Sequence, residues 1–255
     1  MGRRLTAAVA ATMLAVVGFA APAGASHSNG YHWARTTNPF VLEIDDNVTA
    51  SWDTYLSAAA TDWSASSVLD TTVMQGSFGD RNSCAPLSGH VEVCNAKYGS
   101  TGWLTILSIS TTTGNHITKA SVKFNDTYLG QTPYNSPGWR QMLMCEQLGH
   151  TLGLANQDSD PNNTNLGSCM DRSSNPAGPP SNEHPNQHDY DELAAIYAHL
   201  DGFATTSGGS SLVHDGPASW GTLVSGQVCR GVGTFRRDLG SDNVVITRVV
   251  WAEVS

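Results

Sequence analysis

Ser136-Pro-Gly-Trp-Arg-Gln-Met-Leu-Met-Cys-Glu-Gln-Leu-Gly-His-Thr-Leu-Gly-Leu-Ala-Asn-Gln-Asp158 is the stretch that decides the fold. A serine followed by a proline is an N-cap and first-turn signature, so a helix is predicted to begin at Ser136 and to stop at Gly153. At 100° per residue, Glu146 and His150 lie on one helix face, and apolar residues occupy several sides, which is typical of a buried helix. Burying a carboxylate and an imidazole is costly unless a partner such as a metal ion accounts for them.

The end of this stretch, Gly149-His150-Thr-Leu-Gly153-Leu154 followed by Asn156-Gln-Asp158, resembles the zinc helix of the metzincin metallopeptidases. That motif is H-E-x-x-H-x-x-G-x-x-H. Its first two histidines bind zinc from one helix face, its glutamate activates the zinc-bound water, and its glycine turns the chain toward the third histidine. The resemblance implies the roles of the matching positions.

Three of the five motif positions differ in this chain. Glu146 stands at the first histidine, Gln147 at the general base and Asn156 at the third histidine, whereas His150 matches. The resemblance therefore implies a zinc site of Glu146, His150 and Asn156, with Asp158 as another third ligand, that is weaker than a three-histidine site. The alternative is that Glu146 and His150 pair with each other or with neighbours and bind no metal.

Two later segments add to the resemblance, which covers roughly residues 38–201. Gly167-Ser-Cys-Met170-Asp is similar to the Met-turn that supports the zinc site of metzincins, and 189–197 is similar to the closing helix of the matrixin-type members. The implied fold is α+β: a twisted mixed β-sheet, a central active-site helix, a Met-turn at Met170 and a closing helix.

Composition divides the chain into four parts. Residues 1–25 carry two arginines, an apolar run and an Ala-Gly-Ala cleavage site, and they are identified as a secretory signal peptide. We expect the metzincin-like domain at 26–202, a Gly/Ser linker at 203–215 and a small β-meander at 216–255 that packs on or beside the main domain. The resemblance does not explain this last part.

Hydrophobic periodicity predicts the elements that precede the central helix. A strand at 38–48, a helix at 49–64 and a strand at 67–74 form a β-α-β unit with a parallel strand pair. Further strands are predicted at 91–94, 103–110 and 114–126. By the resemblance, the last of these is an edge strand that lies along the cleft and binds an extended peptide.

The five cysteines are typical of an oxidising compartment. Cys84 and Cys94 enclose a short loop and are predicted to pair. A second bridge is predicted between Cys145 in the helix and Cys169 in the following loop, with two free buried thiols as the alternative. Cys229 is then left over.

Charge and local motifs limit the ligands. Without Arg3 and Arg4 the net charge of −9 becomes −11, and no basic cluster exists, so neither nucleic acid nor an anionic membrane is an expected partner. The run 158–165 begins Asp-x-Asp-x-Asn but lacks the glycine and glutamate of a calcium loop, so calcium is less expected than an Asx-rich turn.

Three other histidines could be metal ligands or could have only local structural roles. His116 is expected to be an incidental strand residue and not a ligand. His184 and His188 are four residues apart, but Pro185 between them argues against one helix, so capping or surface roles are expected.

Three functions follow from these residues. The favoured one is a secreted metzincin-like protein with impaired or lost zinc-dependent peptidase chemistry, since Gln147 cannot accept a proton, that binds a peptide or protein in its cleft. The second is an active zinc metalloendopeptidase with non-standard ligands. The third, an enzyme of another kind, has no Ser/His/Asp or paired-carboxylate signature to support it.

Overall fold

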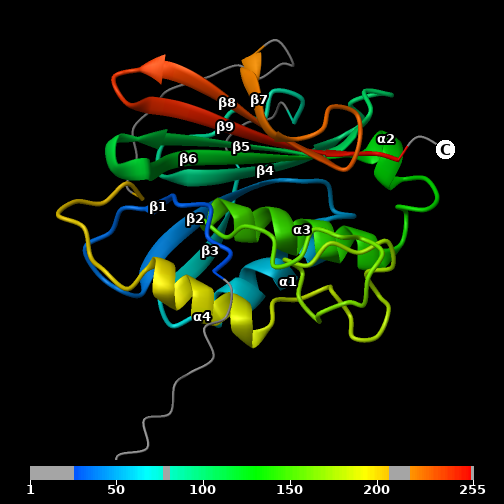
Figure 1. Cartoon of the computed structure of the whole chain (residues 1–255), viewed down its shortest axis with the longest axis horizontal. Helices are drawn as coiled ribbons and strands as arrows, with labels where there is room; N and C mark the ends of the chain where they lie inside the picture. Colours follow the sequence, from blue (N-terminus) through cyan, green and yellow to red (C-terminus); the bar gives the residue numbers. More distant parts are fainter. Residues whose placement is uncertain (1–25, 77–80, 207–218, 254–255) are drawn as a thin grey trace, which may run out of the picture.

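The computed structural model describes residues 26–76, 81–206 and 219–253, so the predicted signal peptide and most of the predicted linker lie outside the described residues. The fold is α+β: one nine-stranded sheet runs in the order β3-β2-β4-β6-β5-β9-β8-β7, with β1 paired to β6. Helices α1, α3 and α4 gather on one side of this sheet, whereas β7, β8 and β9 lie at the far side of the molecule from α4 (Figure 1).

The elements follow one another along the chain as follows: β1 (His32–Trp33), β2 (Phe40–Asn47), α1 (Asp53–Trp63), β3 (Leu69–Gln75), β4 (His90–Ala96), β5 (Trp103–Thr112), η1 (Thr113–Asn115), β6 (His116–Asn125), α2 (Asp126–Leu129), α3 (Pro137–Thr151), α4 (Gln187–Ile196), β7 (Thr222–Gly226), β8 (Val232–Gly240) and β9 (Asn243–Trp251). Among the described helices, none is long and apolar enough to cross a lipid bilayer.

The predicted β-α-β opening is confirmed. Strands β2 and β3 are parallel, and α1 connects them. The apolar positions of α1 face inward, because Leu56, Ala59, Ala60 and Trp63 are all buried. They pack in the main core with side chains of the sheet and of α3.

The central helix α3 begins and ends close to the predicted residues. The Ser136 hydroxyl accepts a hydrogen bond from the Trp139 backbone N–H at 3.3 Å, and Pro137 occupies the first turn. At the other end, Gly153 has a φ of 98°, and a Cβ there would lie 2.3 Å from the Tyr31 carbonyl oxygen. Glycine therefore allows both the turn and the close approach of the N-terminal segment.

The expectation that the strand at 114–126 is a sheet edge is wrong. Strand β6 pairs with β4 on one side and with β5 on the other, so both of its hydrogen-bonding edges are occupied. At the ends of the described strand order lie β3 and β7. A peptide cannot add to β6 as an extra strand, because its backbone groups are already paired.

The C-terminal strands form the predicted meander, but they continue the main sheet instead of packing beside it. Strand β9 is antiparallel to β5 from Trp103↔Trp251 to Thr111↔Val244, and β8 and β7 follow outward. A second, smaller core on the outer face joins the two parts, since it contains Trp103 of β5 together with Phe235 and Trp251. The tail and the main domain therefore share one sheet and one set of packed residues.

Candidate functional site

Folding brings together the three side chains predicted as metal ligands. Glu146 and His150 lie one turn apart on α3, and the shortest distance between His150 Nε2 and Glu146 Oε1 is 3.6 Å. Asn156, beyond the turn at Gly153, donates from Nδ2 to the same Glu146 oxygen at 2.9 Å. Glu146 and His150 are almost completely buried. The three side chains therefore lie together, and the Glu146 carboxylate is hydrogen-bonded to Asn156.

A fourth side chain, Arg248 of β9, completes this site. Its Nη2 lies 3.3 Å from Glu146 Oε1 and also donates to Asn156 Oδ1. Alternation along β9 explains its direction, because Ile246 and Val250, two residues away on each side, pack against the main core on the helix side of the sheet. The guanidinium thus contacts Glu146 and Asn156, two of the three predicted metal ligands.

Burial and charge set the protonation of the site. Burial favours the neutral acid of Glu146, but the Arg248 charge and His150 outweigh it, so the pKa of Glu146 is lowered and the residue is a carboxylate. Burial, followed by the Arg248 charge, lowers the pKa of His150. The His150 Nδ1 lies 2.8 Å from the Leu154 carbonyl oxygen, which requires a hydrogen on Nδ1. In the neutral ring Nε2 then carries the lone pair.

The residue at the general-base position is turned into the interior. Gln147 is fully buried and donates from Nε2 to Glu146 Oε2 at 3.2 Å. Its carboxamide therefore helps to hold the glutamate in place. An amide has no basicity at neutral pH, so Gln147 cannot remove a proton from a water molecule.

The donor set does not fit a zinc ion while Arg248 occupies this position. Asn156 directs its N–H group to Glu146 and its oxygen to the guanidinium, so its amide has no free oxygen to offer. A divalent ion beside a buried guanidinium would also meet strong repulsion. Only the lone pair of His150 Nε2, which has no hydrogen-bond partner among the described residues, remains suited to a metal.

Met170, the residue of the predicted Met-turn, packs against α3 at Gly149. It is fully buried, and its carbonyl oxygen accepts from Asn156 Nδ2 at 3.1 Å. A Cβ on Gly149 would lie 2.5 Å from the Met170 sulfur and 2.7 Å from the ring of Trp63. Glycine at 149 therefore lets sulfur and ring touch the helix backbone.

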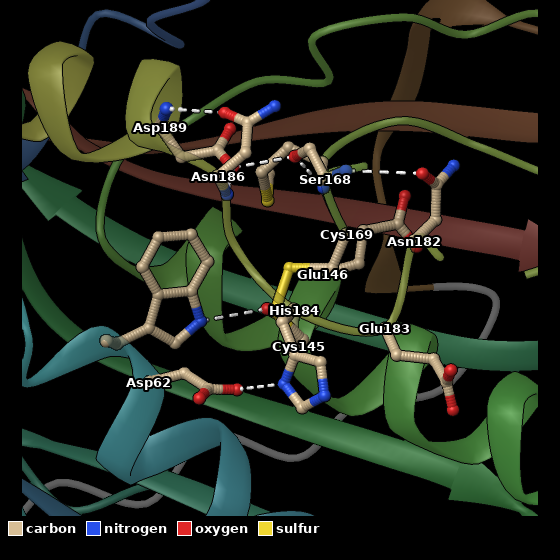
Figure 2. Close-up of a disulfide and its surroundings, with 12 residues drawn as sticks. Asp62, Cys145, Glu146, Ser168, Cys169, Asn182, Glu183, His184, Asn186 and Asp189 are labelled. Atoms are coloured by element: carbon tan, nitrogen blue, oxygen red, sulfur yellow. Dashed lines mark hydrogen bonds and ion pairs between the residues drawn. A yellow bond between two sulfur atoms is a disulfide. The ribbon is translucent and has the colours of Figure 1, made fainter. Parts of the chain in front are cut away.

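The predicted pairing of the cysteines is confirmed. Cys84 is bonded to Cys94, and Cys145 to Cys169, whereas Cys229 is a free, exposed thiol. Figure 2 shows the second bridge joining α3 to the loop that carries Met170. In the chain-entropy view, a loop of this length stabilises the fold by about 3 kcal/mol.

The loop is also tied to α4. The Ser168 hydroxyl donates to the buried Asp189 carboxylate at 2.6 Å, and Asn186 and Asp189 form a capping box at the start of α4 (Figure 2). His184 lies outside this helix and contacts Asp62 at 2.7 Å. As expected, His184 and His188 do not share a helix.

The run 158–165 forms successive Asx turns. Asp158 Oδ1 accepts from the Asp160 backbone N–H at 2.8 Å, and Asp160 Oδ1 accepts from the Asn162 N–H at 3.0 Å. Asp158 also accepts from Asn163 Nδ2. This loop therefore holds Asp158 at the surface and does not bring it in as the alternative third ligand.

Above the site lies a cleft of about 670 Å³ whose walls come from both parts of the chain. Glu146, His150 and Arg248 line its floor, and the lining includes two more arginines, Arg172 and Arg230. Aromatic rings also face it, from Tyr134, Trp139 and Trp251. The cleft is thus rich in cationic groups although the whole chain carries a net charge of −9.

The sequence analysis missed Arg248, although a signal was present. In Val244-Val-Ile-Thr-Arg-Val-Val-Trp251, the arginine is the one charged residue of a strand that is mostly apolar. Alternation places it on the same face as Ile246 and Val250, and an inward-facing arginine requires a carboxylate partner. The carboxylate partner of Arg248 is the buried Glu146.

No protein-family model matches the sequence, and no curated protein matches it. Among solved structures, the chain is similar to the structure of myroilysin, with a TM-score of 0.37 and a sequence identity of 12%. The similarity covers 65% of this chain and 96% of that one. A likeness at this level says nothing of the activity of this chain.

Proposed function

We propose that this chain is a secreted protein of metzincin-like architecture whose old active-site cleft binds a peptide or protein ligand and no longer cleaves it. The observation that carries the proposal is the guanidinium of Arg248, which is bonded to both Glu146 and Asn156. It supplies inside the protein the positive charge that a metal ion supplies in a peptidase. The secretory signal peptide predicted at residues 1–25 and the two disulfides support an extracellular location.

The loss of peptidase chemistry follows from two features of the same site. Zinc would have to displace the guanidinium, and Gln147 offers no base for the attacking water. Removing a general base typically lowers a rate by about 10²–10⁴-fold. We therefore expect no proteolysis above background.

The ligand is proposed to carry a carboxylate. Arg248 lines the cleft, and its charge adds to the positive potential there. Arg172 and Arg230 add positive charge to the walls, and the aromatic rings offer apolar surface beside it. An extended peptide with an acidic side chain or a free C-terminus matches this combination.

Two measurements test the proposal on the purified chain without its signal sequence. The first is cleavage of casein with and without added zinc, for which no turnover is expected. Chelator-sensitive cleavage that His150→Ala abolishes would instead establish the zinc metalloendopeptidase with non-standard ligands.

The second measurement is calorimetric binding of a library of short acidic peptides and of their amidated, neutral counterparts. Binding is expected for the acidic set and should weaken at least tenfold in the double variant Arg172→Gln/Arg230→Gln. The matched control is Arg236→Gln, an exposed arginine of β8 outside the cleft lining. Equal binding of acidic and neutral peptides, or an equal loss in the control, would refute the carboxylate-binding cleft.

A further inference from the structure

A second histidine cluster lies apart from the cleft, where β1, the start of β6 and the segment after α4 meet. His32 Nε2 and His199 Nε2 are 3.1 Å apart, and each lies 3.6 Å from Asp201 Oδ1. His116 Nε2 lies 3.2 Å from the same oxygen. Three imidazole nitrogens from distant parts of the sequence thus surround one carboxylate oxygen.

The second carboxylate oxygen of Asp201 and the second ring nitrogen of His116 have partners of their own, so Asp201 Oδ1 and His116 Nε2 are left to face the centre of the cluster. Arg35 Nη1 donates to Asp201 Oδ2 at 2.9 Å, and the Arg35 backbone N–H donates to the same atom at 3.2 Å. His116 Nδ1 lies 2.8 Å from the Thr113 carbonyl oxygen and therefore donates to it. Metal-binding histidines and carboxylates are commonly oriented by such outer contacts.

The spacing suits a small tetrahedral ion. A zinc ion with bonds of about 2.1 Å keeps its ligand atoms about 3.4 Å apart, and the separations of 3.1 Å between His32 and His199, 3.6 Å from each of them to Asp201, and 3.2 Å from His116 to Asp201 are close to that value. The ligand atoms of His32, His199 and Asp201 all lie within 4.8 Å of one another.

We propose that His32, His116, His199 and Asp201 form a zinc-binding site. Four protein ligands close the coordination sphere, so the ion has a structural role and does not activate water. It ties the short N-terminal strand β1 and the start of β6 to the segment that follows α4. His116 then has a defined role, although its sequence context favoured an incidental residue.

Another cluster is the main competitor for a metal. His27, His188 and Asp189 also hold their ligand atoms within 4.8 Å of one another. Ser168 and the Asn186 backbone N–H both contact Asp189 Oδ2, so Asp189 Oδ1, His27 Nε2 and His188 Nδ1 have no hydrogen-bond partner among the described residues. We favour the group around Asp201 because it has an additional imidazole, His116, 3.2 Å from the carboxylate oxygen, and variants separate the two groups.

The test is zinc titration of the purified, chelator-stripped chain without its signal sequence, followed by calorimetry and by metal analysis after gel filtration. One equivalent of zinc is expected to bind and to raise Tm. His199→Gln, at an exposed ligand, should lower the affinity at least tenfold without unfolding the protein, and His116→Gln should do the same. Cobalt(II) in place of zinc should give the visible absorption of a tetrahedral site, and His199→Gln should remove it.

Three control variants locate the ion. His184→Gln alters an exposed histidine outside every cluster named above and should leave binding unchanged. His188→Gln and His150→Gln report on the other two candidate positions and should also leave it unchanged. Absence of bound zinc, retention of full affinity in His199→Gln and His116→Gln, or loss of the ion in His188→Gln or His150→Gln would overturn the proposal.

Discussion

Glu146 and Asp201 each have an arginine and histidine beside them, yet the two carboxylates are arranged differently. At Glu146, Arg248 approaches Oε1, the same oxygen that faces His150 at 3.6 Å and accepts from Asn156. At Asp201, Arg35 binds Oδ2, and Oδ1 is left to three histidines. In the first site the guanidinium occupies the position of a cation, and in the second it only orients the carboxylate.

The difference shows that residue types alone do not define a metal site. Both groups contain a carboxylate and an imidazole, which are good zinc ligands. The two groups differ in the number of imidazoles, one at Glu146 and three at Asp201, and in which carboxylate oxygen the arginine contacts. An arginine on the outer oxygen strengthens a metal site, whereas an arginine on the inner oxygen replaces the metal.

The largest expected effect comes from removing the internal cation. Arg248→Met leaves the Glu146 carboxylate buried without its charge partner, and this should cost about 3–5 kcal/mol in the free energy of unfolding at pH 7. The double variant Arg248→Met/Glu146→Gln should recover much of the loss, because no charge is left unpaired. Urea unfolding of both variants measures the difference, with Arg236→Met on the exposed face of β8 as a control expected within about 0.5 kcal/mol of the parent.

The pH dependence of this effect has a definite sign. The folded-state pKa of Glu146 is lowered below its unfolded value, so the ion pair contributes stability above about pH 4.3 and loses it as the pH falls toward the folded-state pKa. The deficit of Arg248→Met should therefore shrink in acid. A deficit that is equal at pH 7 and pH 4, or equal in the single and double variants, would argue against a buried ion pair.

A smaller effect is expected at Glu92, a third buried carboxylate, whose charged neighbour is another acid. Burial and the charge of Asp45, its partner across β2 and β4, raise the pKa of Glu92 to about 8. Its folded-state pKa is above the unfolded value, so its stabilising contribution is complete below about pH 4.3 and disappears as the pH rises to about 8. Glu92→Gln should stabilise the protein at pH 8 by on the order of 1–3 kcal/mol and have little effect at pH 4.

The measurement is the difference in Tm between parent and Glu92→Gln across this pH range. Asp70→Asn, at an exposed carboxylate on β3, serves as the control and should give a flat difference. A Glu92→Gln difference that does not grow with pH would mean that Glu92 is ionised in the folded protein at pH 7.

The smallest expected effect concerns the orienting arginine of the other site. Arg35 donates from three nitrogens, to Asp201, to the His199 carbonyl and to Asn38, and lysine cannot make this set of bonds. Arg35→Lys should cost about 1 kcal/mol in stability and lower zinc affinity about tenfold, because the carboxylate loses its orientation. Unchanged zinc affinity alongside the stability loss would show that Arg35 does not orient a metal ligand.

Local rules predicted the elements of the fold well. The Ser136-Pro137 signature predicted the start of α3, and periodicity predicted β4 and β5 within a few residues and a β-meander where β7, β8 and β9 lie. Both disulfides followed from the positions of their cysteines in loops and helix. These features depend on residues that are near one another in the sequence.

Pairing across long distances was not predictable in the same way. The interior position of β6 and the contact between β9 and β5 depend on which strands meet in the sheet, and periodicity does not specify that order. The partner of Glu146 lies 102 residues away in the sequence. Similarly, His116 became part of a cluster only because β1 pairs with the start of β6.

The pairing of β9 with β5 has a consequence for biosynthesis. Glu146 is made about a hundred residues before the group that neutralises it, so a nascent chain that has reached α3 carries an interior acid with no counterion. Helix α3 can pack against the sheet with full stability only after β9 has been synthesised and has paired with β5. A chain that is released from the ribosome before residue 248 has been added should accordingly be degraded by quality-control proteases, whereas the full-length chain should resist them.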